Sequence, residues 1–169
     1  MTSRELFEGL YEQHAGAVKG YAMRRADPAR AEDVVAEVFL VAWRRLDELP
    51  AEPRPWLFGV ARRVLANERR RAARQGAAID RLSPSAEPAE GPLVGDQALG
   101  EALANLSDTD REALLLIAWE GLKHRDAARV LGIREATFTV RLHRAKRRLA
   151  RALESRAPAT ASTTRLETP

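Results

Sequence analysis

Cationic side chains crowd one segment of helical length near the carboxyl end of the chain. The segment runs from Leu131 to Arg148 and reads LGIREATFTVRLHRAKRR. Guanidinium and ammonium groups at this density can bind an acidic partner, or they can simply solvate an exposed helix face. The distribution of these charges around the helix distinguishes the two interpretations.

Around a helical wheel, the segment separates into an apolar side and a cationic side. The apolar side consists of Phe138, Leu142, Ala145 and Leu149. The opposite side carries Val140, His143, Arg144 and Arg147, with Arg141 and Arg148 at one margin and Thr139 and Lys146 at the other. A solvated face usually mixes both signs of charge, whereas almost no acid follows Glu135 here. We therefore expect this helix to contact DNA, with its first half at base edges and its later arginines at phosphates.

The residues before this helix have the arrangement of a helix-turn-helix. Ala128 is small enough for two helices to cross closely, and Gly132 stands where the turn needs a positive φ angle. The apolar residues that would lock the two helices together are Leu131, Ile133, Phe138 and Leu142. Val140 then projects toward the DNA groove, where its methyl groups suit contact with the methyl group of thymine.

A second cationic helix face lies in the first half of the chain. The segment WLFGVARRVLANERRRAAR sets its arginines and Asn67 against an apolar stripe that begins at Trp56. On its own, this face is about as consistent with DNA contact as with a solvated face or with arginine stems packed on the core. Two such helices in separate units predict two contacts on one duplex, or a duplex held on a large partner.

Catalytic chemistry is not expected. The three histidines, His14, His124 and His143, are scattered without a metal-ligand or nucleophile–base spacing. The sequence contains neither a glycine-rich phosphate loop nor a cysteine, and the missing cysteine excludes disulfides and thiolate chemistry. The chain is therefore predicted not to be an enzyme, and to use no cofactor and no metal.

Helices must position these surfaces, and the apolar periodicity predicts an all-α chain of two small helical domains. We expect the first domain over residues 1–75, a flexible linker over 76–95, the second domain over 96–153 and a disordered tail over 154–169. The clearest helix runs from Asp27, its cap, to Leu46. Next, the three prolines of DELPAEPRP predict a loop, and Pro55 opens a third helix. In the second domain, Ser107 is a predicted helix cap.

Composition is typical of a soluble cytoplasmic protein. The 169 residues are 45% hydrophobic and carry a formal net charge of +4. The first residues lack the apolar core of a signal peptide, and the longest apolar run, Ala113–Trp119, is too short to span a bilayer. We expect no membrane contact.

Three segments occur together in a specific order: AEDVVAEVFLVAWRRL, WLFGVARRVLANERRR, and LSDTDREALLLIAWEGLKHRDAARVLGI followed by TFTVRLHRAKRRL. Over about residues 6–75 and 98–149 the chain resembles extracytoplasmic-function (ECF) sigma factors, the smallest sigma subunits of bacterial RNA polymerase. The resemblance implies a stress- or signal-responsive factor that binds core polymerase and promoter DNA and directs initiation. It leaves open whether an anti-sigma factor binds the chain.

The resemblance also assigns residues to roles. In this family, region two binds the clamp helices of the polymerase β′ subunit and opens the minus-ten element, and region four reads the minus-thirty-five element and meets the β flap. The implied polymerase contacts are Asp33, Ala36, Glu37, Phe39 and Arg44. The implied minus-ten contacts are Arg54, Trp56, Arg62, Arg63, Asn67, Arg70 and Arg71. The implied minus-thirty-five contacts are Thr139, Val140, Arg141, His143, Arg144 and Arg147.

The chain departs from the family pattern at several positions. Ala36 stands where many relatives have Gln, and Lys123 and Arg134 replace the usual Ser or Thr caps of two helices. Each lost cap costs about 1 kcal/mol of helix stability unless another group replaces it.

Two other functions stay under consideration. A stand-alone helix-turn-helix repressor or activator would need dimer symmetry and a sensor domain. An adaptor without DNA contact would not need the acid-free cationic face.

Overall fold

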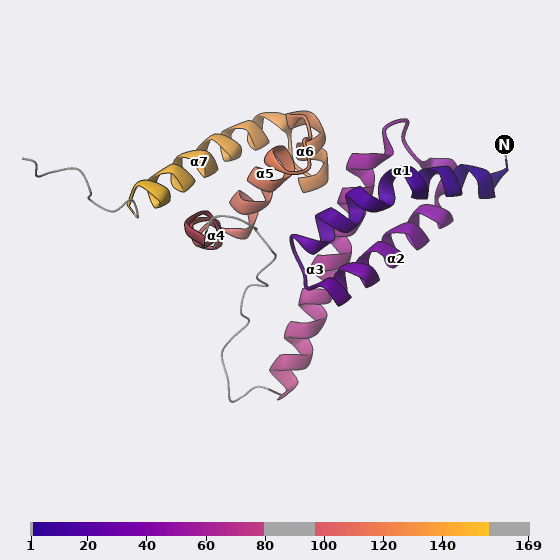
Figure 1. Cartoon of the computed structure of the whole chain (residues 1–169), viewed down its shortest axis with the longest axis horizontal. Helices are drawn as coiled ribbons and strands as arrows, with labels where there is room; N and C mark the ends of the chain where they lie inside the picture. The colour runs from indigo at the N-terminus through magenta and orange to yellow at the C-terminus, as the bar shows by residue number, and fades with distance from the viewer. Residues whose placement is uncertain (1, 80–96, 156–169) are drawn as a thin grey trace, which may run out of the picture.

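The computed structural model describes residues 2–79 and 97–155, which confirm the all-α prediction (Figure 1). The first part consists of α1 (Ser3–Met23), α2 (Pro28–Arg44), a short 3-10 helix (Leu46–Glu48) and α3 (Pro53–Ile79). The second part consists of α4 (Gln97–Ala104), α5 (Asp108–Ala118), α6 (His124–Leu131) and α7 (Glu135–Glu154). No helix in these ranges is both long and apolar enough to cross a membrane.

Side-chain caps fix the starts of the first two helices. The Thr2 hydroxyl accepts from the Glu5 amide at 3.3 Å, and the Thr2 amide donates to the Glu5 carboxylate at 2.6 Å. The Asp27 carboxylate accepts from the Arg30 amide at 3.0 Å, as the sequence predicted. These three contacts satisfy amides that have no partner within a helix, and so they set where α1 and α2 begin.

The proline-rich segment between α2 and α3 differs from its prediction as a loop. Leu46–Glu48 form a 3-10 helix, and α3 begins at Pro53 rather than Pro55. Prolines are tolerated in a first turn because the missing N–H groups would have no helical partner there. At its other end α3 continues to Ile79, so residues 76–79 are helical and do not belong to the predicted linker.

The second part contains the predicted helix-turn-helix. Gly132 ends α6 with a φ of 68°, in the left-handed region that glycine adopts at little cost. Ala128 and Phe138 are buried where α6 meets α7, and the Ser107 hydroxyl caps α5 by accepting from the Asp110 amide. Neither Lys123 nor Arg134 makes a side-chain cap hydrogen bond, as their residue types predicted.

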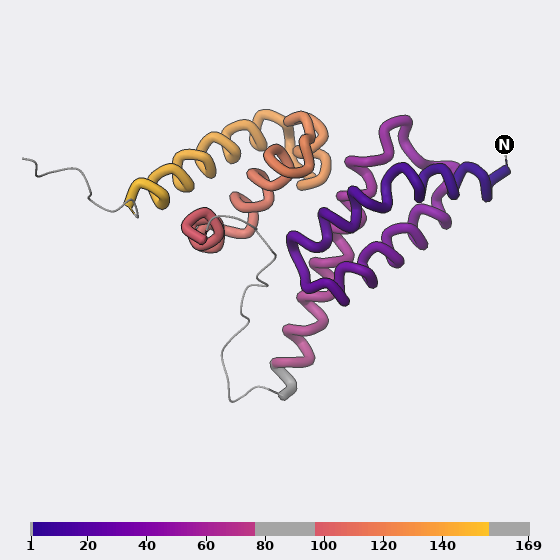
Figure 2. Tube along the Cα trace, viewed as in Figure 1, coloured from indigo at the N-terminus to yellow at the C-terminus, as the bar shows by residue number. Residues whose placement is uncertain are grey.

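The two parts pack against each other. Figures 1 and 2 show α6 beside α3, and the buried side chains of both parts belong to one hydrophobic cluster. The predictions of a linker over 80–95 and of a tail over 156–169 lie outside the described residues. Glu154, which the sequence placed in the tail, is instead the last residue of α7.

Candidate nucleic-acid interface

The cationic face of α7 lies where the helical wheel placed it. Phe138, Leu142 and Ala145 are buried, whereas Val140 is 51% exposed among the cations. The other exposed members of this face are Thr139, His143, Arg144, Lys146, Arg147 and Arg148, and Arg141 is half-buried. A helix that buries one stripe and leaves its cations in solvent can present that charge to a nucleic acid.

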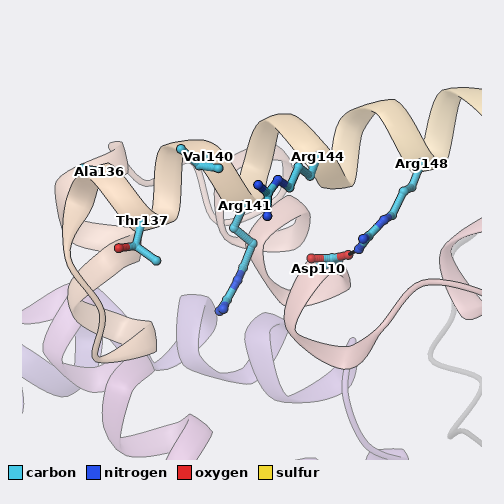
Figure 3. Close-up of a pocket in the computed structure, with 7 residues that line it drawn as sticks. All are labelled: Asp110, Ala136, Thr137, Val140, Arg141, Arg144 and Arg148. Carbon is cyan, nitrogen blue, oxygen red and sulfur yellow. Dashed lines mark hydrogen bonds and ion pairs between the residues drawn. The ribbon is translucent and has the colours of Figure 1, made fainter.

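A concave surface borders this face on the side of α5. It has a volume of about 450 Å³ and is lined by Asp110, Ala136, Thr137, Val140, Arg141, Arg144 and Arg148. Figure 3 shows Arg148 reaching from α7 to Asp110, with which it forms an ion pair. The Asp110 side chain is only 7% exposed, so its charge is largely neutralised by Arg148. Arg141 and Arg144 make no ion pair with any described residue, and their charge stays available.

Thr139 is held by a short chain of hydrogen bonds. Its hydroxyl donates to the Glu135 carbonyl at 3.1 Å, and His124 Nδ1 lies 3.2 Å from the same oxygen. Since a hydroxyl has one proton, Nδ1 of His124 must be the donor in the second contact. The His124 ring also meets Phe138 edge-on, with centroids 5.7 Å apart. Thr139 therefore offers a base edge its methyl group and an oxygen lone pair, and no proton.

The predicted minus-ten residues follow α3 from its first turn. Arg63, Asn67, Arg70 and Arg71 are exposed, and Trp56 and Arg62 are half-buried. Local contacts hold two of the exposed arginines. Arg63 donates to the Gly59 carbonyl at 3.2 Å, and Arg70 donates to Asn67 Oδ1 at 2.6 Å. Arg54 differs from the others, because its guanidinium donates to the Glu120 carbonyl in the second part of the chain, at 3.0 Å.

The predicted polymerase contacts divide into two groups. Asp33, Ala36, Glu37 and Arg44 are exposed on α2. Phe39 is only 3% exposed, and it packs on the rings of Phe7 and Tyr11 at 6.2 and 4.7 Å between centroids. The polymerase contact implied for Phe39 needs an accessible side chain, whereas α1 covers this ring.

Sequence reasoning missed the large apolar side chains that α1 and α2 do expose. Leu40 is 48% and Trp43 is 46% exposed, and Leu6 and Tyr11 on α1 are exposed as well. Both Leu40 and Trp43 lie beside the exposed polar residues of α2. The sequence does indicate this exposure. Adjacent residues on a helix point in different directions, so an apolar residue next to the buried Phe39 cannot be buried on the same side.

Comparison with known families matches two segments of the chain. Residues 10–75 match the model for sigma-70 region 2, and residues 96–149 match the model for sigma-70, region 4. The ECF RNA polymerase sigma factor SigL of Mycobacterium tuberculosis is 36% identical over 154 residues, which cover 85% of this chain and 86% of SigL. The ferric citrate uptake sigma factor FecI of Escherichia coli is 32% identical, covering 78% and 82%.

Two solved structures resemble both parts of the chain together. One is the sigma factor RpoE in complex with the anti-sigma factor NepR from Bartonella quintana, with a TM-score of 0.71 and 27% identity. It covers 89% of this chain and 98% of RpoE. The other is CnrH in complex with the cytosolic domain of CnrY, with a TM-score of 0.64, 26% identity and 89% coverage of each chain.

Proposed function

The chain belongs to the ECF family of RNA polymerase sigma factors, and from this premise we propose which of its surfaces meet polymerase and promoter. Sigma factors of this family bind RNA polymerase and promoter DNA and direct promoter-specific initiation, and they are not enzymes. In this chain, α7 enters the major groove of the minus-thirty-five element. The exposed cationic face around Val140, opposite the buried Phe138 stripe, carries this proposal.

Base reading falls to the first half of α7. Val140 packs on a thymine methyl group, and Thr139 accepts a hydrogen bond from an exocyclic amine of adenine or cytosine. Arg144 and Arg147 lie one and two turns further along the helix and hold phosphates. Arg148 contributes less to DNA binding, because Asp110 already occupies its guanidinium.

The first part of the chain acts at the minus-ten element. The exposed cations Arg63, Arg70 and Arg71 hold the backbone of the non-template strand. Trp56, half-buried at the start of α3, supplies an aromatic surface for an unstacked base, and Arg62 and Asn67 follow about two and three turns further along the helix.

Polymerase binds the exposed face of α2. The β′ clamp helices contact Asp33, Glu37 and Arg44, and Leu40 and Trp43 supply the apolar area that Phe39 cannot provide. The β flap contacts the second part of the chain. Ala36 offers no hydrogen bond, so the polar contact that relatives make there is missing.

Run-off transcription with purified core polymerase tests this function. The chain is expected to form a complex with core and to start transcripts at discrete sites on fragments of genomic DNA. Core polymerase alone is the control. A chain that binds duplex DNA tightly without core, and starts no transcript with it, would be a helix-turn-helix repressor instead.

A further inference from the structure

A small apolar patch interrupts the cationic face of α7. Val140 is 51% exposed, and Ala136 and Thr137, four and three residues before it, are exposed as well. Residues three and four apart on a helix are neighbours, so the isopropyl group of Val140 lies beside the methyl groups of these two side chains. All three residues line the concave surface on the side of α5 (Figure 3). Apolar surface is therefore available where α7 is proposed to meet base edges.

The charged groups around this patch do not distinguish one base from another. Arg144 lies one turn beyond Val140 and is proposed to hold a phosphate, a contact that carries no sequence information. Among the described residues that line the concave surface, Asp110 alone has a carboxylate, and Arg148 already pairs with it. Asp110 is therefore not free to accept a hydrogen bond from a base amine. On this side of α7, base discrimination depends on the apolar contact of Val140.

The methyl group proposed to meet Val140 is not unique to thymine. In the major groove, thymine presents a C5-methyl group beside its O4 acceptor, whereas cytosine presents an N4 amine beside an unsubstituted C5 edge. A methyl group on C5 of cytosine lies at the same place in the groove, because both bases are pyrimidines paired in the same geometry. Val140 has no donor or acceptor with which to tell O4 from N4. Its side chain therefore fits 5-methylcytosine as well as thymine, and it loses the same contact with cytosine and with uracil.

We infer that α7 binds the minus-thirty-five element more tightly when a cytosine facing Val140 carries a C5-methyl group, so that promoter use responds to cytosine methylation. This inference rests on the proposed function, which places α7 in the major groove. Burial of one methyl group against an apolar side chain changes an affinity about fourfold. The chain reads the methyl group and makes no chemical change to the DNA.

Four duplexes that differ at one base pair test this inference. A library of minus-thirty-five sequences, transcribed by the complex of the chain with core polymerase, first locates the base pair at which Val140→Ala changes the preference. The pyrimidine of that pair is then thymine, uracil, cytosine or 5-methylcytosine, and the complex binds each duplex in competition with one labelled promoter. Thymine is expected to bind about fourfold more tightly than uracil, and 5-methylcytosine about fourfold more tightly than cytosine.

Matched controls separate the apolar contact from other effects of the methyl group. Val140→Ala removes the isopropyl group and keeps a strong helix former, and it is expected to bind the two members of each pair alike. Lys19→Ala, at an exposed position of α1, is expected to keep both fourfold differences. A duplex with 5-methylcytosine only between the two promoter elements is expected to bind as its unmethylated form does.

Three results would overturn the inference and leave the proposed function in place. In the first, a complex that starts transcripts binds the two members of each pair alike. In the second, the preference for the methylated duplexes persists in Val140→Ala, because the methyl group then acts through the shape of the DNA. In the third, Val140→Ala leaves the library profile unchanged. A complex that starts no transcript would contradict the proposed function, and this inference with it.

Discussion

Arg25 and Arg144 show two opposite uses of the same side chain. Arg25 is buried between Tyr21, Glu112 and Glu120, and its guanidinium is engaged on several sides. Arg144 lies on the exposed face of α7 and makes no ion pair with any described residue. The difference is that the carboxylates of Glu112 and Glu120 face Arg25, whereas no carboxylate among the described residues pairs with Arg144. Arg25 meets acids of the second part and helps to hold the two parts together, whereas Arg144 meets none and is free for the DNA contact proposed above.

Removing Arg25 should have the largest effect, because this one side chain pairs with both the buried Glu120 and the part-buried Glu112 of the second part. We expect Arg25→Met to weaken the contact between the two parts by about 3 kcal/mol. Small-angle scattering of the free chain should then show a larger radius of gyration. Arg30→Met is the control, since Arg30 is exposed and lies 3.5 Å from the Glu68 carboxylate, so this pair contributes little. An unchanged radius for Arg25→Met would mean that the buried charges do not hold the parts together.

Removing Arg144 should affect transcription and leave the contact between the parts intact. We expect Arg144→Ala to lower run-off transcription about tenfold at every minus-thirty-five sequence, because a phosphate contact carries no base preference. The slope of the logarithm of the DNA-binding constant against the logarithm of the salt concentration should become smaller by about one unit. Lys19→Ala, which removes an exposed cation of α1, should change neither quantity. A loss restricted to some promoters would show that Arg144 reads bases.

Within α7, Val140 differs from the arginines around it, since it has no charge and is proposed to contact a base rather than a phosphate. We expect Val140→Ser to change the preference at one base pair of the minus-thirty-five element about fivefold, because thymine loses an apolar contact. Run-off transcription from a library of minus-thirty-five sequences measures this preference. A library profile identical to wild type would exclude a base-reading role for Val140.

His124 should have the smallest effect, because it acts through Thr139. We expect His124→Phe to keep the ring against Phe138 and to reduce preference about threefold at the base pair next to that of Val140. In a chain that already carries Thr139→Val, the same change should have no further effect on the library profile. Equal effects in both backgrounds would show that His124 acts independently of the Thr139 hydroxyl.

The helix-turn-helix could be predicted because its signals are local. Gly132 needs a positive φ angle whatever surrounds it, and the spacing of Phe138 and Leu142 fixes which side of α7 is buried. The cationic face follows from that spacing. These features depend on residues a few positions apart, where sequence and geometry are tightly linked.

The buried contacts around Arg25 could not be predicted, because the partners are remote in sequence. Tyr21 and Glu112 are separated by 91 positions, and neither residue type indicates that the other is its partner. The burial of Phe39 could not be predicted for a similar reason. Its position on α2 is at the edge of the apolar stripe, where the sequence alone allows either a buried or an exposed side chain. Phe39 is buried because the rings of Phe7 and Tyr11 on α1 pack against it.

Cleavage of promoter DNA by tethered iron chelates tests most directly whether each part acts at its own element. Cysteines at the exposed positions Ala72 on α3 and Ala150 on α7 would carry the chelate, one at a time, in the complex with polymerase. We expect cuts near the minus-ten element from Ala72 and near the minus-thirty-five element from Ala150, about 25 base pairs apart, or roughly 85 Å. Cuts from both positions at one element, or none from Ala150, would contradict it.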